Sequence, residues 1–246
     1  ICAAASQLAC TPDLRPDKYV VELSKEKSRL ERIGEEGVNI SVGASINLSY
    51  QALSDEWQKV FRALAVFPGT FNAIAAEAVC EDQDHKGLSE MVKRSLVIYD
   101  KATDRYRLHD LVRVFANAKL SDQELYIAQY MHAAHFKQVL GDADDLYKRG
   151  GEHVLLGLSL FDTERTNIKA GHAWAVDYAS NDEKVAHLCN EYLYAGYLIL
   201  SLRHHPRERI SWSETALAAA KRLNLKQYQS YHFGNLSNAY YSIGNA

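Results

Sequence analysis

The sequence predicts a mainly α-helical protein, in which a compact segment with one small β-hairpin precedes an α-solenoid of helix pairs. Three observations carry this prediction. Apolar residues recur at helical spacing through most of the 246 residues. Two short β-type segments flank a polar turn between about residues 96 and 109. From Ser121 onward, long helical stretches follow one another across short turns.

The first 40 residues are predicted to contain two helices, one around Leu8 and one from about Tyr19 to Ile33. The sequence Thr11-Pro-Asp breaks the first helix, because proline disfavours a helical residue before it. A linker is expected at residues 34–43.

Residues 41–120 are predicted to form a winged helix-turn-helix. Ser54 caps a helix with an acidic first turn, and Pro68-Gly69 ends it. Two short helices follow, at about residues 74–79 and 86–95. The hairpin comes next, and a further helix begins near His109 and is expected to bury Leu111. Three helices followed by a hairpin are the order of a winged helix.

Beyond this segment, the sequence predicts helices throughout residues 121–246. Ser121 and Glu124 have the spacing of a capping box. The helical stretches are expected at about residues 122–140, 163–179, 182–202, 206–223 and 226–243.

Composition narrows the class of protein. A hydrophobic content of 47% and a net charge of −3 exclude a disordered chain. The sequence has no apolar run long enough to span a membrane, and its start lacks the basic region of a signal peptide. Cys2, Cys10, Cys80 and Cys189 are scattered, which favours reduced thiols in a cytoplasmic protein.

Residues 41–120 resemble the winged-helix segment of the STAND family of signalling ATPases, of the NB-ARC type. The stretches that carry the resemblance are LSYQAL at 48–53, VFRALAVFPGTF at 60–71, LSEMVKRSLV at 88–97 and YRLHDLVR at 106–113. Residues 1–40 resemble the helical subdomain that precedes this segment in the family. The resemblance implies a regulatory domain that responds to bound nucleotide.

The same resemblance assigns a role to His109 and Asp110. Leu108, His109 and Asp110 stand where the family has Met-His-Asp, whose histidine contacts the β-phosphate of ADP in the resting state. An imidazole at a helix start can donate a hydrogen bond to an anion beside the backbone N–H groups. Asp110 would orient the loop and cap the helix. The alternative is that His109 only caps this helix.

Nucleotide chemistry is not expected in this chain itself. The phosphate-binding sequence GxxxxGK[ST] is absent, and so is GxGxxG. We therefore expect no cofactor and no enzymatic activity here, and we expect ADP or ATP to bind an upstream nucleotide-binding domain in a longer ATPase.

Residues 121–246 resemble tetratricopeptide (TPR) repeats. Phe233, Leu236 and Tyr240 match the first helix of a repeat, and residues 216–220 match the end of the preceding second helix. The spacing is closer to the repeats of about 40 residues than to those of about 34. The resemblance implies repeats that bind a protein or a small inducer, with more repeats to follow, and it leaves an oligomer possible.

Two other functions stay open. A DNA-binding regulator would read DNA through the winged helix, but residues 41–120 carry ten Lys or Arg and ten Asp or Glu, whereas DNA-binding modules have a basic face. Lys86, Lys93 and Arg94 of the third helix are opposed by Glu90. Nucleic acid is therefore an unexpected partner. The other alternative is a plain TPR scaffold.

The remaining polar residues give weak indications. The pairs His132/His135 and His204/His205 lack the partners of a zinc site, so we expect surface or interface histidines and no metal. Glu164 and Asn167 are expected either to bond at a helix end or to lie on a solvated face.

Overall fold

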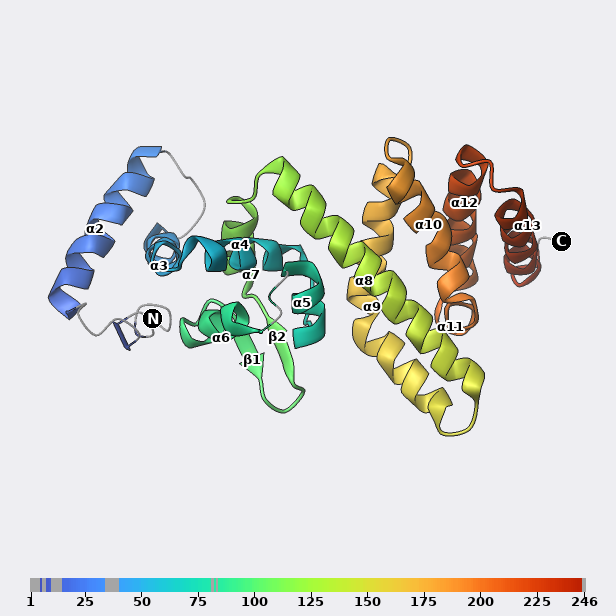
Figure 1. The fold of residues 1–246 in the computed structure, drawn as a ribbon, viewed down its shortest axis with the longest axis horizontal. Coiled ribbons are helices and arrows are strands. Elements are labelled where there is room, and N and C mark those ends of the chain that lie inside the picture. Colours follow the sequence, from blue (N-terminus) through green and yellow to red (C-terminus); the bar gives the residue numbers. More distant parts are fainter. Residues whose placement is uncertain are drawn as a thin grey trace. The chain divides into compact units, whose positions relative to one another are not determined.

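The computed structural model describes Ala5, Leu8, Ala9 and residues 15–33, 40–80, 82 and 84–244. Within these residues the chain is mainly helical, with one two-stranded sheet (Figure 1). The chain divides into an N-terminal unit of residues 1–128 and a C-terminal unit of residues 129–246, and the division falls inside helix α8 (Asp122–Arg149). The predicted segments 1–40, 41–120 and 121–246 stay a prediction. The helix around Leu8 lies largely outside the described residues, and so do residues 34–39 of the predicted linker. The linker prediction is wrong for residues 40–43, which form the first turn of α3 (Ile40–Gln51).

The N-terminal unit consists of short helices, one 3-10 turn and the hairpin, followed by the first turns of α8. Its elements before α8 are α2 (Pro16–Ile33), α3 (Ile40–Gln51), α4 (Asp55–Ala63), η1 (Leu64–Val66), α5 (Ala73–Cys80), α6 (Lys86–Lys93), β1 (Ile98–Asp100), β2 (Arg105–Arg107) and α7 (Asp110–Asn117).

Helix α2 packs on α3 through polar contacts. The Tyr19 hydroxyl lies 3.1 Å from that of Ser45, and the Asn47 amide donates to Glu26 at 2.7 Å. Both Glu26 and Asn47 are buried. A buried carboxylate is tolerated when it accepts such hydrogen bonds, so this contact fixes one register between the two helices.

Helix α4 begins where the sequence predicts, but it ends at Ala63, earlier than predicted. The Ser54 hydroxyl accepts from the Trp57 N–H at 3.4 Å, and the chain leaves the helix through η1 before Pro68. Phe61, fully buried, lies 5.6 Å from Tyr50 and 6.4 Å from Phe115, measured between ring centroids. Burying a phenylalanine contributes about 1.5–3 kcal/mol, so these rings from α3, α4 and α7 form the centre of the unit.

The hairpin pairs β1 with β2 in antiparallel register, with Tyr99 opposite Tyr106. Phe71 forms an isolated bridge to Tyr106 and stacks on Phe67 at 4.2 Å. Asp104, at the end of the turn, has a φ of 53°, a backbone conformation that Asp tolerates better than most residues. The predicted hairpin is therefore confirmed, and Phe71 ties it to the loop that follows η1.

Within its described residues, the C-terminal unit consists of helices alone. After α8 come α9 (His153–Tyr178), α10 (Glu183–Ala195), α11 (Tyr197–Arg203), α12 (Pro206–Arg222) and α13 (Lys226–Tyr241). Helix α10 packs on α9 and on α12, and α12 packs on α13. Helices α8 and α9 are longer than predicted, and the single helix predicted over residues 182–202 is wrong.

A contact with α8 breaks that helix into α10 and α11 at Gly196. A Cβ at Gly196 would lie 2.3 Å from the Leu140 side chain, so only glycine lets the two segments approach. Asp144, also on α8 and fully buried, accepts from the Ile199 N–H at 2.8 Å and lies 2.9 Å from the Lys148 ammonium. Asp144 thus satisfies a backbone donor at the start of α11.

Candidate functional site at the start of helix α7

The hairpin places His109 at the start of α7. Leu108, which is buried, follows β2 directly and anchors the chain. His109 is the exposed N-cap of α7, and its Nδ1 accepts from the Leu111 N–H at 3.3 Å. A cap of this kind satisfies one of the free N–H groups of the first turn.

This cap leaves the other ring nitrogen of His109 for an external partner. Since Nδ1 accepts a hydrogen bond, the neutral ring carries its proton on Nε2. The side chain is exposed, so Nε2–H can donate to a group outside the N-terminal unit. Anions favour such a position because the helix dipole and the remaining N–H groups act in the same direction.

Asp110 is the first residue of α7 and does not cap the helix as expected. Its side chain is 82% exposed and accepts from Arg113 at 2.8 Å. Arg113 also donates to the Pro68 carbonyl at 3.0 Å. Asp110 therefore orients Arg113, which ties α7 to the loop between η1 and α5.

The same loop is tied to the hairpin. The Arg105 guanidinium donates to the Thr70 hydroxyl and to the Thr70 carbonyl, both at 2.7 Å. Together with Arg113 and Pro68, these bonds hold the loop, β2 and the start of α7 in one arrangement. The backbone around His109 is consequently set by contacts far apart in the sequence.

The rest of α7 differs in part from the prediction. Val112 and Ala116 are buried, but Leu111 is 39% exposed and Val114 is 59% exposed. The predicted inward position of Leu111 is therefore wrong. The exposed aliphatic side chains lie on the same helix as His109, one turn apart.

The sequence did not indicate the ion pair that holds the first turn of α8. Arg62 on α4 pairs with Glu124 and donates to the Tyr50 hydroxyl at 2.7 Å. Glu124 also accepts from the Ser121 N–H at 3.0 Å, which confirms the capping box. These bonds, from Ser121 first and from Arg62 second, lower the pKa of Glu124 to about 2.

Several polar residues of the C-terminal unit are buried instead of exposed. His132 and His204 are 3% and 5% exposed, so neither is a surface histidine, and the expected alternative of an interface position stays a prediction. Glu164 and Asn167 lie inside α9, both buried, and the Asn167 amide donates to Glu164 at 2.9 Å. Neither a helix-end bond nor a solvated face describes this pair, which forms a polar contact in the core.

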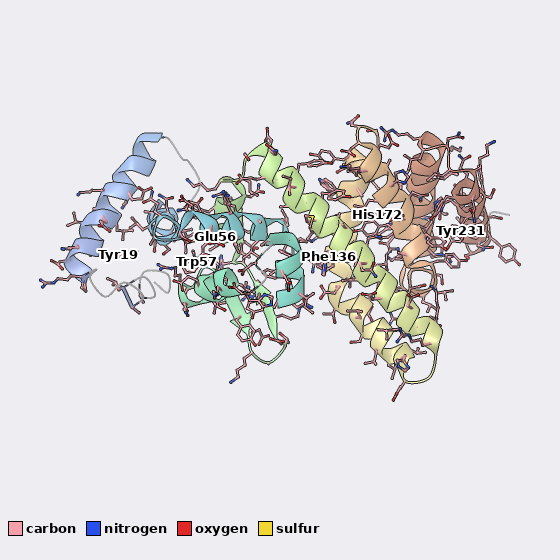
Figure 2. The ribbon with its side chains drawn as sticks, viewed as in Figure 1. Tyr19, Glu56, Trp57, Phe136, His172 and Tyr231 are labelled. Carbon is pink, nitrogen blue, oxygen red and sulfur yellow. The ribbon has the colours of Figure 1, made fainter. Side chains whose placement is uncertain are left out.

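An aromatic cluster surrounds His172, which Figure 2 labels. Its ring stacks on Trp212 with centroids 3.6 Å apart and 9° between the planes, and Tyr192 approaches it edge-on at 5.5 Å. Burial lowers the pKa of His172 to about 3. A neutral imidazole at this position behaves as an aromatic core residue.

Metal-binding groups, cysteine pairs and membrane-spanning helices are all absent from the described part of the chain. It contains no group of three or more His, Cys, Asp or Glu side chains that could hold a metal ion. Cys80 and Cys189 are free thiols, and burial raises the pKa of both, that of Cys189 to about 12. No described helix is long and apolar enough to cross a membrane.

Comparison with known proteins relates the chain to bacterial regulators. No family model matches it. It is 29% identical over 184 residues, 71% of its length, to a Mycobacterium tuberculosis protein named as an HTH-type transcriptional regulator. It is 31% identical over 118 residues, 47% of its length, to the regulatory protein AfsR of Streptomyces coelicolor. The chain spans only 20% and 12% of these two relatives.

One solved structure is similar over 98% of the chain and 41% of its own length. It is a STAND protein with a tetratricopeptide repeat sensor from Pyrococcus horikoshii, with 14% sequence identity and a TM-score of 0.38. The score is too low to establish a shared fold. The similarity to regulators therefore depends on the sequence matches.

Proposed function

We propose that this chain is the regulatory and sensor portion of a STAND-type signalling ATPase. In this proposal residues 41–120 form a winged helix, which couples the nucleotide state to the binding of a protein or small inducer by TPR-like repeats at 121–246. The observation that carries it is the exposed cap residue His109, with Nδ1 bonded to its own helix and Nε2 left to donate. The similarity to bacterial regulators supports the regulatory role.

The arrangement of the N-terminal unit supports the winged helix. Helices α4, α5 and α6 are followed by the β1–β2 hairpin, and α7 comes next. His109 would donate from Nε2 to a phosphate of ADP held by a nucleotide domain, beside the N–H groups at the start of α7. The chain itself would carry no catalytic residue and hold no nucleotide alone.

The proposed switch is one two-state element biased by two ligands. A hydrogen bond to a charged group contributes about 1.5–3 kcal/mol, which corresponds to roughly 10-fold to 150-fold in ADP affinity. Inducer binding to the repeats would favour the state in which this bond is broken, and ADP would favour the state in which it is formed.

Two substitutions at His109, made in the full-length protein that contains this chain, separate the switch from a simple cap. His109→Ser keeps a side chain that can cap α7 but removes the imidazole donor, whereas His109→Ala removes both. We expect both variants to release ADP at least tenfold faster and to raise basal signalling. Only His109→Ala should lose about 1 kcal/mol of stability.

The result that would refute this proposal is ADP retention by His109→Ser at the wild-type level. His109 would then act only as a helix cap. Release is measured by displacement of a fluorescent ADP analogue, and stability by urea unfolding of the same preparations.

A second candidate function is DNA binding, which the names of the mycobacterial relatives favour. The basic residues of α6 do not support it, because they are paired with carboxylates. The buried Arg94 pairs with Glu90 at 2.8 Å, and Lys93 lies 3.7 Å from the same carboxylate. Lys86 pairs with Asp84 at 2.5 Å. Since the chain spans about a fifth of these relatives, their HTH-type name can rest on a segment outside the match. A gel shift whose affinity falls steeply with salt would favour DNA binding.

A further inference from the structure

A small cavity, whose lining is mainly apolar and includes a few polar side chains, lies among α10, α11, α12 and α13 in the C-terminal unit. Its volume is about 10 Å³, which is room for one water-sized group. The side chains of His204, Asn235 and Arg209 contribute to its lining, together with Tyr197 and Ser201. Arg209 and Tyr197 are half-buried, so this side of the cavity reaches the surface.

Two of the buried lining residues have polar atoms without a partner among the described residues. His204 is 5% exposed, and neither of its ring nitrogens is hydrogen-bonded. Asn235 is 6% exposed, and its Nδ2 makes no hydrogen bond of normal geometry, although the Tyr231 hydroxyl lies near it. The nearby Ser201 hydroxyl cannot donate to them, because it donates to the Leu198 carbonyl at 2.6 Å. Buried polar groups left without partners are unfavourable, so a group that fills the cavity and bonds to them would be stabilised.

The Arg209 guanidinium also lacks a hydrogen-bond or ion-pair partner within the described part of the chain. Neighbouring cations differ in this respect, since Arg203 pairs with Asp162 at 2.9 Å and Lys169 pairs with Glu208. A half-buried arginine with free donors presents a fork that matches an oxyanion.

The surroundings of the cavity are positive. Burial is the main cause that lowers the pKa of His204 to about 4, and the Glu208 carboxylate opposes this shift. Three nearby cations lower the pKa further: Lys169, Arg165 and Arg209. The ring is therefore neutral near pH 7 and can donate from one nitrogen. The same three cations attract an anion.

We propose that this cavity and its rim bind an oxyanion, namely a carboxylate or phosphate group. One oxygen occupies the cavity against His204 and Asn235, and the other oxygens lie at the rim against Arg209. The size of the cavity sets this division, because it admits one oxygen and no more. The inference goes beyond the proposed function: it gives α10–α13 a ligand chemistry and requires no nucleotide.

Binding is tested on the whole 246-residue chain, with inorganic phosphate and acetate as separate probes at constant ionic strength in sodium chloride. The indole N–H signal of Trp212, whose ring lines the cavity, reports occupancy in ¹H–¹⁵N spectra. We expect a saturable shift with at least one probe, and the tighter probe identifies the group as phosphate or carboxylate.

Two arginines of α12 provide a matched pair of variants. Arg209→Gln should weaken binding at least tenfold, whereas Arg207→Gln, which removes the same charge from an exposed position two residues away, should change it less than twofold. Both should melt like the wild type without oxyanion, because neither guanidinium makes a contact that the variant loses. Absence of a saturable shift with both probes would overturn the proposal and leave a single buried water as the occupant. Equal weakening by the two variants would overturn it as well, since it would show non-specific attraction.

Discussion

Acidification from pH 7.5 to 5.5 should strongly destabilise the C-terminal unit, because four of its histidines are buried in the neutral form. Burial lowers the pKa of His132, His204 and His232 to about 4 each and that of His172 to about 3. An unfolded histidine has a pKa of about 6.5. The unfolded chain therefore binds more protons than the folded chain between about pH 4 and pH 6.5.

This difference in proton binding determines both the direction and the size of the change in stability. The stability that the four rings confer is complete above about pH 6.5 and is lost as the pH falls toward 4. Relative to pH 7.5, the loss of unfolding free energy at pH 5.5 is slightly more than 1 kcal/mol for each ring, and about 5 kcal/mol for the four together. Glu124 has a pKa of about 2. The stability that its ionised form contributes is therefore retained at pH 5.5 and declines only at much lower pH.

Thermal unfolding followed by circular dichroism at pH 7.5, 6.5 and 5.5 measures the loss. For a unit of this size, the melting temperature should fall by on the order of 10–20 °C between the first and last pH. His172→Phe keeps an aromatic ring against Trp212 and removes one titrating group, so it should recover about a quarter of the fall. Melting temperatures within 2 °C of each other at pH 7.5 and 5.5 would refute the reasoning, as would an NMR pKa near 6.5 for these rings.

Two further predictions concern the break between α10 and α11, both measured by urea unfolding. Asp144→Ala leaves the buried Ile199 N–H without an acceptor and should lower the free energy of unfolding by about 2–3 kcal/mol. Asp144→Asn keeps an acceptor and should lower it less. Equal losses of stability in the two variants would contradict this account. Gly196→Ala places a Cβ against Leu140 and should cost about 1–3 kcal/mol. Its control is Gly234→Ala on α13, where a Cβ meets nothing within 4 Å, so the change should be neutral or stabilising. Similar losses from the two glycine variants would show that steric contact at Gly196 is not the cause.

Local features of the structure were predictable because their causes lie within a few residues. Ser54 caps α4, and Ser121 and Glu124 form the predicted capping box. The hairpin forms around the polar turn that follows Asp100, and His109 begins α7 as expected. In each case the hydrogen bond joins residues at most a few positions apart, so the amino-acid types alone specify it.

The candidate site was predictable only in part. The sequence placed His109 at a helix start, but the ring nitrogen that remains free depends on the observed bond to the Leu111 N–H. The predicted capping role of Asp110 is wrong, because Asp110 pairs with Arg113 and His109 caps the helix. The ADP contact stays a prediction, since it would require a nucleotide-binding domain.

The sequence by itself determined the helical character, the caps and the hairpin, while the tertiary structure alone decided which polar groups are buried and where one helix breaks. Gly196 interrupts a helical pattern because Leu140, 56 positions earlier in the chain, occupies the space that a side chain at position 196 would need. His204 and Asn235 line a cavity because α10 to α13 pack around them. Hydrophobic periodicity indicates which face of a helix turns inward, but burial depends on which other helices cover that face, and those contacts join residues that are distant in the chain.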